Sequence, residues 1–137
     1  MTTQYWLVKS ESETYSWDDL VRDGRTDWTG VRNYAARLHL KAMRADDAVL
    51  FYHSGEAKSI VGIARVTKPA FPDATADEPG WMAVELAPVN PLTTPVTLAQ
   101  IKADATLKAM ELVRHSRLSV SPVRPAEFAR VKKLGGA

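Results

Sequence analysis

Short hydrophobic runs separated by polar loops recur along the chain and predict β-strands. The clearest run is residues 48–52, whose length and continuous apolar character are typical of a buried strand. The other predicted strands are residues 5–8, 59–66, 81–86 and 114–120. Pro88, Pro91 and Pro95 are expected to end the strand that begins at Trp81, because proline has no backbone N–H to donate within a sheet.

Between residues 31 and 43 the hydrophobic spacing changes to that of an amphipathic helix. Its predicted buried face is Val31, Tyr34, Ala35, Leu38 and Ala42, and its polar, cationic face is Asn33, Arg37, Lys41 and Arg44. Capping patterns predict further short helices, one from Ser16 to near Gly24 and one from Thr97 to Ala103. Others are expected at residues 106–113 and 125–134, the last beginning at Pro125 and closed by Gly135 and Gly136.

These elements predict the α+β class, with a mixed sheet of about five to six strands that curls into a small barrel. Several short helices are expected around the sheet. No repeat or linker interrupts the pattern, so residues 1–137 are interpreted as a single domain.

Composition narrows the class of protein without assigning a function. The chain is 45% hydrophobic and 25% charged and has no cysteine, which excludes disulfides and thiolate metal sites. No apolar run approaches the roughly 20 residues of a membrane span, and the N-terminus does not resemble a signal peptide. We therefore expect a cytoplasmic protein.

The net charge of +2 is too small to indicate a nucleic-acid binder, but the charge is unevenly distributed. Residues 101–137 contain eight basic and three acidic side chains, whereas residues 69–100 contain four acidic and no basic ones. A basic region can follow a phosphate backbone, although ordinary solvated helix faces explain these charges equally well.

Candidate chemistry gathers at both ends of the segment from Trp28 to Ser54. Trp28 and Gly30 precede the predicted helix, where free backbone N–H groups favour an anion. The strand that follows ends in aromatic, imidazole and hydroxyl groups, at Tyr52, His53 and Ser54. Together these groups suit a flat heteroaromatic ring attached to a phosphate.

Neither a metal site nor a nucleophile is indicated. His39, His53 and His115 lack metal-binding spacing, and no nucleophile-elbow motif or phosphate-binding glycine loop is present. We expect no metal and no cofactor.

Four short sequence motifs together resemble those of the EVE domain family, at residues 5–11, 28–34, 51–54 and 116–120. That family includes the thymocyte nuclear protein group and many small bacterial proteins, and the resemblance runs from about residue 4 to 131. Two positions depart from the family pattern, Ser12 in place of a proline and Thr29 in place of an acid, and both affect the shape of loops. The resemblance implies a PUA-like pseudo-barrel related to YTH and ASCH domains. It also implies recognition of a modified base in nucleic acid, with modified cytosine in DNA as the leading candidate, and no catalysis.

Reading a modified base requires that it leave its stack, that an aromatic ring receive it and that hydrogen bonds test its edge. On this logic Trp28 is the stacking face and Tyr52 or Trp6 a second wall, with Val31 and Leu118 also in the pocket. The predicted edge-reading residues are Ser10, Asn33, His53, Ser54 and Ser119. The predicted phosphate contacts are Lys9, Arg32, Arg37, Lys41 and Arg117. The expected partner is DNA or RNA that contains the modified base. The protein is expected to act as a monomer, and no membrane partner is expected.

Structural roles compete with these assignments. Trp17 and Trp81 are expected in the core, and Tyr52 is as compatible with the core as with a pocket. Asn33 is equally suited to capping a helix, and Arg37 to a surface ion pair with Asp46 or Asp47. Two other functions stay open: a small hydrolase of modified nucleosides using Lys9 and Glu11, and a protein-interaction module.

Overall fold

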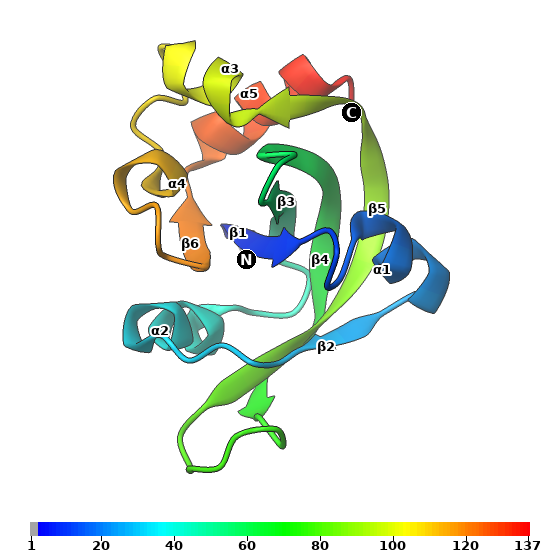
Figure 1. The fold of residues 1–137 in the computed structure, drawn as a ribbon, viewed down its shortest axis with the longest axis vertical. Coiled ribbons are helices and arrows are strands. Elements are labelled where there is room, and N and C mark those ends of the chain that lie inside the picture. Colours follow the sequence, from blue (N-terminus) through cyan, green and yellow to red (C-terminus); the bar gives the residue numbers. More distant parts are fainter. Residues whose placement is uncertain (1–2) are drawn as a thin grey trace.

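The computed structural model describes residues 3–137 and, within that range, contains six strands and five helices (Figure 1). The strands are β1 (Tyr5–Glu11), β2 (Thr26–Trp28), β3 (Ala48–Ser54), β4 (Ser59–Pro72), β5 (Met82–Thr97) and β6 (Val120–Val123). The helices are α1 (Trp17–Asp23), α2 (Tyr34–Ala42), α3 (Leu98–Ala103), α4 (Glu111–Arg114) and α5 (Pro125–Gly135).

All the strands belong to one mixed sheet in the order β2-β5-β4-β3-β1-β6. The pair β1 and β3 is parallel, and the remaining neighbours are antiparallel. The α+β class and the curled mixed sheet are confirmed. The predicted barrel is not closed, because β2 and β6 remain as the two edges of the sheet.

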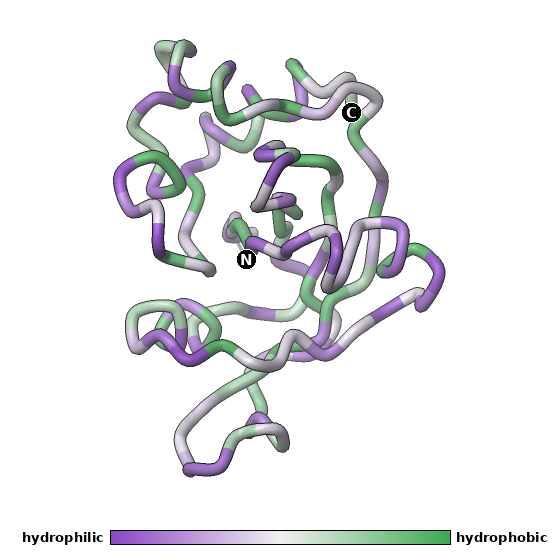
Figure 2. The backbone as a smooth tube through the Cα atoms, viewed as in Figure 1, coloured by the Kyte–Doolittle hydropathy of each residue, from purple (hydrophilic) through white to green (hydrophobic). Residues whose placement is uncertain are grey.

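The central strands β1 and β3 are buried on both sides, and successive residues point to opposite sides. Trp6, Val8 and Phe51 lie in what we call the aromatic core, whose other large members include Trp17, Leu20 and Leu40. Leu7 and Leu50 point the other way, into what we call the aliphatic core, together with Tyr52, Ile60, Ile101, Leu107 and Val131. Burial on both sides explains the continuous apolar runs of these strands (Figure 2).

The prolines were expected to end strand β5, but the strand continues through Pro88, Pro91 and Pro95 to Thr97. Strand β2 pairs only with residues 84–86 of β5, so beyond them this edge of β5 has no sheet partner within the described chain. A free edge tolerates residues that lack an N–H. The register between β4 and β5 also shifts at several points, which bends the pair.

The segment from residue 114 to 119 is not a strand, which corrects the prediction. Glu111 pairs with Arg114 (3.7 Å) and His115 (3.0 Å) across one helical turn, so α4 forms here. A turn follows, with the Leu118 N–H donating to the His115 carbonyl at 3.0 Å, and β6 begins only at Val120. The predicted helix at residues 106–113 is reduced to turns followed by α4.

Helix α2 begins at Tyr34 rather than Val31, and its buried face differs from the predicted one. Ala36 and Leu40 are buried, whereas Tyr34 and Leu38 are exposed. Val31 is buried too, but in the extended segment before the helix, so a helical phase counted from Val31 selects the wrong face.

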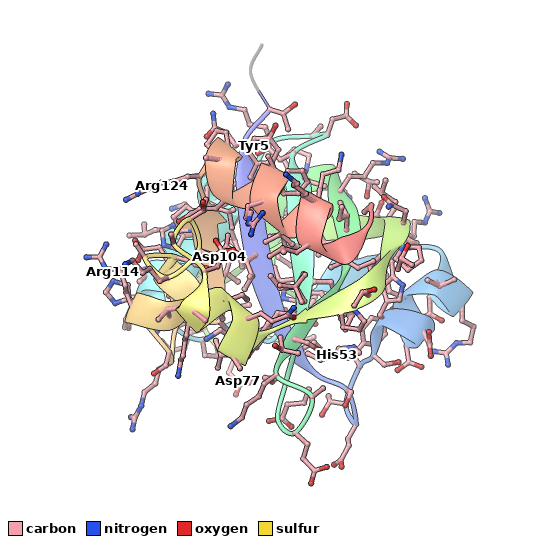
Figure 3. The ribbon with its side chains drawn as sticks, turned by 90° about the horizontal axis from the view of Figure 1, so that it is seen from above. Tyr5, His53, Asp77, Asp104, Arg114 and Arg124 are labelled. Atoms are coloured by element: carbon pink, nitrogen blue, oxygen red, sulfur yellow. The ribbon has the colours of Figure 1, made fainter. Side chains whose placement is uncertain are left out.

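The other helices end close to where their caps predict. Helix α1 opens with a capping box formed by Ser16 and Asp19 and is closed by Gly24, whose φ is 77°. Helix α3 opens with Thr97 and Gln100. Helix α5 lies over β1 (Figure 3), where Phe128 stacks on Tyr5 with ring centroids 4.4 Å apart.

Candidate functional site

A cavity of about 550 Å³ opens where the start of the chain meets the segment between β2 and α2. Its walls come from the end of β1 and the turn after it, from β2 and the loop that leads to α2, and from the residue before β6. The lining residues are Lys9, Ser10, Glu11, Thr14, Tyr15, Thr26, Asp27, Trp28, Thr29, Gly30, Val31, Arg32, Asn33 and Ser119. We call this the first cavity.

Trp28 is one of two half-buried aromatic side chains that line the first cavity, the other being Tyr15. Its ring packs edge-on against Phe51 of the aromatic core, with centroids 5.6 Å apart and planes at 81°. Tyr15 approaches it in the same manner at 6.4 Å and 79°. Because Phe51 and Tyr15 both pack against the indole with perpendicular rings and β2 pairs its backbone with Val84, the protein itself holds the ring in place.

The loop at residues 29–33 is anchored by Asp73, which follows β4 and whose side chain is fully shielded from solvent. One carboxylate oxygen accepts from the Gly30 N–H and from the Arg32 guanidinium, both at 2.9 Å. The other accepts from the backbone N–H and hydroxyl of Thr75, at 2.8 and 2.6 Å. Burial alone would raise the pKa of Asp73, but the hydrogen bonds from Thr75, Gly30 and Arg32 hold it well below its usual range. The loop is therefore held by a carboxylate that is fully charged at neutral pH.

Sequence reasoning missed Asp73, which counts there only as one of the four acidic side chains of residues 69–100. The available signal was local: an aspartate with a threonine two residues later is a common turn pattern. That pattern predicts the Thr75 contacts but not those to Gly30 and Arg32, which lie more than 40 residues away along the chain.

Asn33 combines the two roles considered for it. Its Oδ1 accepts from the Ala36 N–H at 2.9 Å and so caps α2. The same residue lines the first cavity, and its Nδ2 makes no hydrogen bond to residues 3–137. The cap thus fixes the amide in place and leaves two N–H donors for a ligand.

Three other residues that were predicted to contact the ligand also line the first cavity: Lys9, Ser10 and Ser119. The Lys9 ammonium donates to the Ser116 carbonyl at 2.7 Å, and burial lowers the pKa of Lys9. The Lys9 backbone N–H donates to the Ser119 carbonyl, which ties β1 to the segment before β6. The Ser10 hydroxyl donates to the Tyr15 carbonyl and so shapes the turn beneath the cavity.

Four predicted pocket residues lie elsewhere. Trp6 is buried in the aromatic core, with its Nε1 donating to Asp47 at 2.9 Å, and Tyr52 is buried in the aliphatic core, where burial raises its pKa. His53 accepts from the Trp17 backbone N–H at 3.0 Å, and Ser54 follows it at the end of β3 without reaching the first cavity. The reason is geometrical: Trp6 and Tyr52 point into the two cores and His53 toward α1, while the cavity is lined by the end of β1, by β2 and by the loops that follow them.

The predicted phosphate contacts are also dispersed. Arg32 lines the first cavity but is paired with Asp73. The Arg37 guanidinium lies 4.9 Å from the rings of both Tyr34 and Trp81 and donates to the Gly80 carbonyl at 3.2 Å, so it is held by protein groups. Lys41 is exposed and lines neither this cavity nor the next one described.

A second cavity, of about 570 Å³, shares Asn33 with the first. It contains the predicted residues Arg117 and Leu118. The remaining lining residues are Ala35, His39, Glu111, Arg114, His115 and Ser116.

Of the two tryptophans expected in the core, Trp17 is buried there, whereas Trp81 is only partly buried beside Tyr34 and Arg37.

Within residues 3–137, no group of three or more His, Asp or Glu side chains is placed to hold a metal ion. No helix in the same range is long and apolar enough to cross a membrane.

An open, curled mixed sheet with a polar, tryptophan-lined cavity at its loops defines a PUA-like domain. The family model of the EVE domain matches residues 4–134, and the chain belongs to this family.

Solved structures and relatives agree with this placement. The NMR structure of a protein from Rhodopseudomonas palustris is 48% identical, covers 98% of this chain and 94% of that chain, and superposes with a TM-score of 0.92. The crystal structure of human thymocyte nuclear protein 1 in complex with DNA containing 5-methylcytosine is 31% identical, covers 98% and 99% of the two chains, and has a TM-score of 0.92. Mouse thymocyte nuclear protein 1 is 32% identical over 96% of this chain and 74% of its own length.

Proposed function

We propose that this protein is a non-enzymatic reader that binds DNA containing a modified cytosine and receives the extruded base in the first cavity. The observation that carries the proposal is the preformed Trp28 ring, fixed by Phe51 and Tyr15 at the side of a cavity of about 550 Å³. The human relative in complex with DNA containing 5-methylcytosine supports the choice of ligand.

The energetics suit such a role. Extruding a base costs a few kcal/mol, and stacking on an aromatic side chain recovers roughly 1–3 kcal/mol. The rest must come from hydrogen bonds and apolar contact. Asn33 Nδ2 and the Ser119 hydroxyl are candidate groups for the base edge, and Val31 supplies apolar surface. Because a fixed side chain loses little entropy on binding, a preformed cavity favours affinity.

The test is binding of short duplexes that carry one cytosine, one 5-methylcytosine or one 5-hydroxymethylcytosine at the same position, measured by fluorescence anisotropy. We expect the protein to prefer a modified duplex. Trp28→Ala should weaken that binding by about 5- to 150-fold, which corresponds to the loss of one stacked base, while Trp28→Phe should retain part of it.

Trp81→Phe is the matched control, because Trp81 is an indole that does not line the first cavity. It should bind as the unsubstituted protein does. Circular dichroism checks that each variant is folded. Equal affinity for all three duplexes, or equal effects of the Trp28 and Trp81 substitutions, would refute the proposal.

A second candidate, hydrolysis of a modified nucleoside, is favoured by one observation: Lys9 and Glu11 both line the first cavity. A hydrolase would need one of them as an acid or base. The Lys9 ammonium already donates a hydrogen bond to the Ser116 carbonyl, which argues for a structural role. Incubation with acylated and alkylated nucleosides, followed by mass spectrometry, separates the candidates, since a reader leaves every nucleoside unchanged.

A further inference from the structure

The second cavity lies between helix α2 and the segment that runs from α4 to the residue before Ser119. Helix α2 contributes Ala35 and His39, with Asn33 just before it, and the α4 side contributes residues 111 and 114–118. At about 570 Å³ it is as large as the first cavity. No role has yet been assigned to it.

The two cavities are neighbours. Asn33 lines both, and the short segment before β6 lines the second cavity with Ser116 and the first with Ser119. The hydrogen bond from the Lys9 ammonium to the Ser116 carbonyl, 2.7 Å long, connects the two walls directly. The second cavity is therefore the nearest one for a ligand that extends out of the first past Asn33.

Charge distinguishes the cavities. The first holds two cations and two acids, Lys9 and Arg32 against Glu11 and Asp27. The second contains Arg114 and Arg117, two histidines and one acid, and that acid, Glu111, already pairs with His115 at 3.0 Å and with Arg114 at 3.7 Å.

Arg117 is the cation that these pairs leave available. It is exposed, and its guanidinium makes no ion pair or hydrogen bond to the described residues 3–137. Arg114 is 56% exposed and lies at the outer edge of the molecule in Figure 3, so its charge is also open to a ligand from outside. Guanidinium groups bind phosphate oxygens through paired, charge-assisted hydrogen bonds.

We propose that the second cavity binds the backbone phosphate adjacent to the nucleotide whose base occupies the first cavity, with Arg117 and Arg114 as its principal donors. This inference rests on the proposed function. Base and adjacent phosphate are joined through one sugar, which suits two cavities that share a lining residue, Asn33. The contact contributes affinity and fixes the register of the strand without reading sequence.

Glu111 sets the strength of this site. Its carboxylate lies beside the position proposed for the phosphate and repels it, while it also engages Arg114 and His115. Glu111→Gln removes the repulsion and releases Arg114. It should therefore tighten binding of DNA, whereas a purely structural role for Glu111 would leave binding unchanged or weaken it.

The first experiment uses the full chain and a duplex with one 5-methylcytosine, in which single phosphates on either side of that base are replaced by neutral methylphosphonates. Arg117→Ala should weaken binding of the unaltered duplex about five- to thirtyfold, the effect of one to two kcal/mol, and reduce the salt dependence by about one phosphate contact. One methylphosphonate position should weaken binding of the unsubstituted protein and have no further effect on Arg117→Ala. Lys133→Ala, which removes one exposed charge on α5, is the matched control.

The second experiment does not depend on base recognition. Inorganic phosphate is titrated into the protein while the backbone amide signals of Ala35 and Ser116 are followed by NMR. Both signals should shift, and in Arg114→Ala/Arg117→Ala neither should.

The outcomes are separable. If the protein prefers modified duplexes but Arg117→Ala and Lys133→Ala behave alike at every phosphate, the second-cavity proposal is wrong and the reader function stands. If phosphate shifts neither amide, the proposal is also overturned. If the duplexes are bound without preference, yet phosphate binding and its dependence on Arg117 persist, the proposed function fails and the phosphate site remains.

Discussion

The two cores of this protein are closed in different ways, and the difference explains where the first cavity lies. The aliphatic core is covered by side chains from α3, the turns before α4, and α5, among them Ile101, Leu107 and Val131. The aromatic core is covered by α1 and α2 through Trp17, Leu20 and Leu40, and its remaining side meets Trp28 and the loop at residues 29–33.

That loop is held by polar contacts and by the buried Val31 side chain rather than by helix packing. Asp73 fixes Gly30 and Arg32, and Asn33 fixes the start of α2. Helices bury their apolar faces and leave little space between them, whereas a loop held at a few hydrogen bonds can stand away from the core. The comparison teaches that the open side of the molecule depends on a small number of polar anchors, on one buried valine and on the aromatic contacts of Trp28.

The largest effect is expected from removing the ring beneath Trp28. Phe51→Ala should reduce the free energy of unfolding by about 3–5 kcal/mol, because Phe51 is fully buried and contacts the rings of Trp17, Trp28 and His53. Leu50→Ala, its neighbour in the aliphatic core, should cost about 2–5 kcal/mol. Urea denaturation measures both losses.

The two variants should differ in binding. Under conditions where both are folded, Phe51→Ala should bind the 5-methylcytosine duplex more weakly, since Trp28 loses its support, and Leu50→Ala should bind it normally. Equal binding by the two variants would show that the aromatic core does not position Trp28.

Asp73→Asn tests the polar anchor. It removes the charge that Arg32 neutralises and replaces one acceptor with a donor, so we expect a loss of about 1.5–3 kcal/mol in the free energy of unfolding. Asp46→Asn, at the exposed ion pair with Arg65, should have no measurable effect.

The same substitution should change acid sensitivity. The pKa of Asp73 is depressed in the folded state, so its stabilisation is complete above the unfolded value of about 3.9 and is lost as the pH falls below it. Asp73→Asn should therefore show a shallower loss of stability in acid than the unsubstituted protein. Parallel acid denaturation curves would contradict the anchoring role.

Two glycines offer a matched pair, one for each side of the sheet. A Cβ at Gly62 would lie 2.6 Å from the Trp17 indole, a rigid ring already packed against Phe51, so Gly62→Ala should cost about 1–3 kcal/mol. A Cβ at Gly135 would lie 2.9 Å from the Leu92 methyl groups and 3.1 Å from its Cβ. The methyl groups are the end of a flexible side chain, so only a small shift at the Cβ is needed, and alanine is the better residue in a helix. Thermal denaturation should show that Gly62→Ala has the larger effect.

The smallest expected effect is a dependence of stability on pH that comes from His53, which packs against Phe51 of the aromatic core. Burial lowers the pKa of His53, although Asp18 opposes this, and its Nε2 must stay unprotonated to accept from the Trp17 N–H. The unfolded chain therefore binds a proton more readily, and stability should fall as the pH drops below about 6.5. His53→Gln should reduce the decrease in melting temperature between pH 7.5 and 5.5. An unchanged decrease would assign the effect to other groups, such as His39, whose pKa burial also lowers.

Much of the fold follows from local patterns. The capping boxes at Ser16 and Thr97 and the proline and glycines that bound α5 place three helices nearly as the structure has them. The apolar runs locate β1, β3 and the start of β4. The signals are reliable here because each depends on residues within a few positions of one another.

The candidate site was predictable only in part. Seven of the predicted residues line the first cavity: Lys9, Ser10, Trp28, Val31, Arg32, Asn33 and Ser119. Alternation along β1 and β3 shows which residues share a side, but not which side carries the cavity, and so Trp6 and Tyr52 were assigned to the pocket incorrectly. The buried face of α2 was missed for a related reason, because Val31 packs in the segment before the helix.

The sequence by itself therefore determined most of the elements, the ends of α1, α3 and α5, and the family to which the chain is similar, since these depend on neighbouring residues and on the order of short motifs along the chain. Only the tertiary structure decided that Asp73 anchors the loop at residues 29–33, that Arg37 lies between two aromatic rings, and that two cavities meet at Asn33. Those contacts join residues far apart in the chain, and their geometry is set by how the sheet curls rather than by any local pattern.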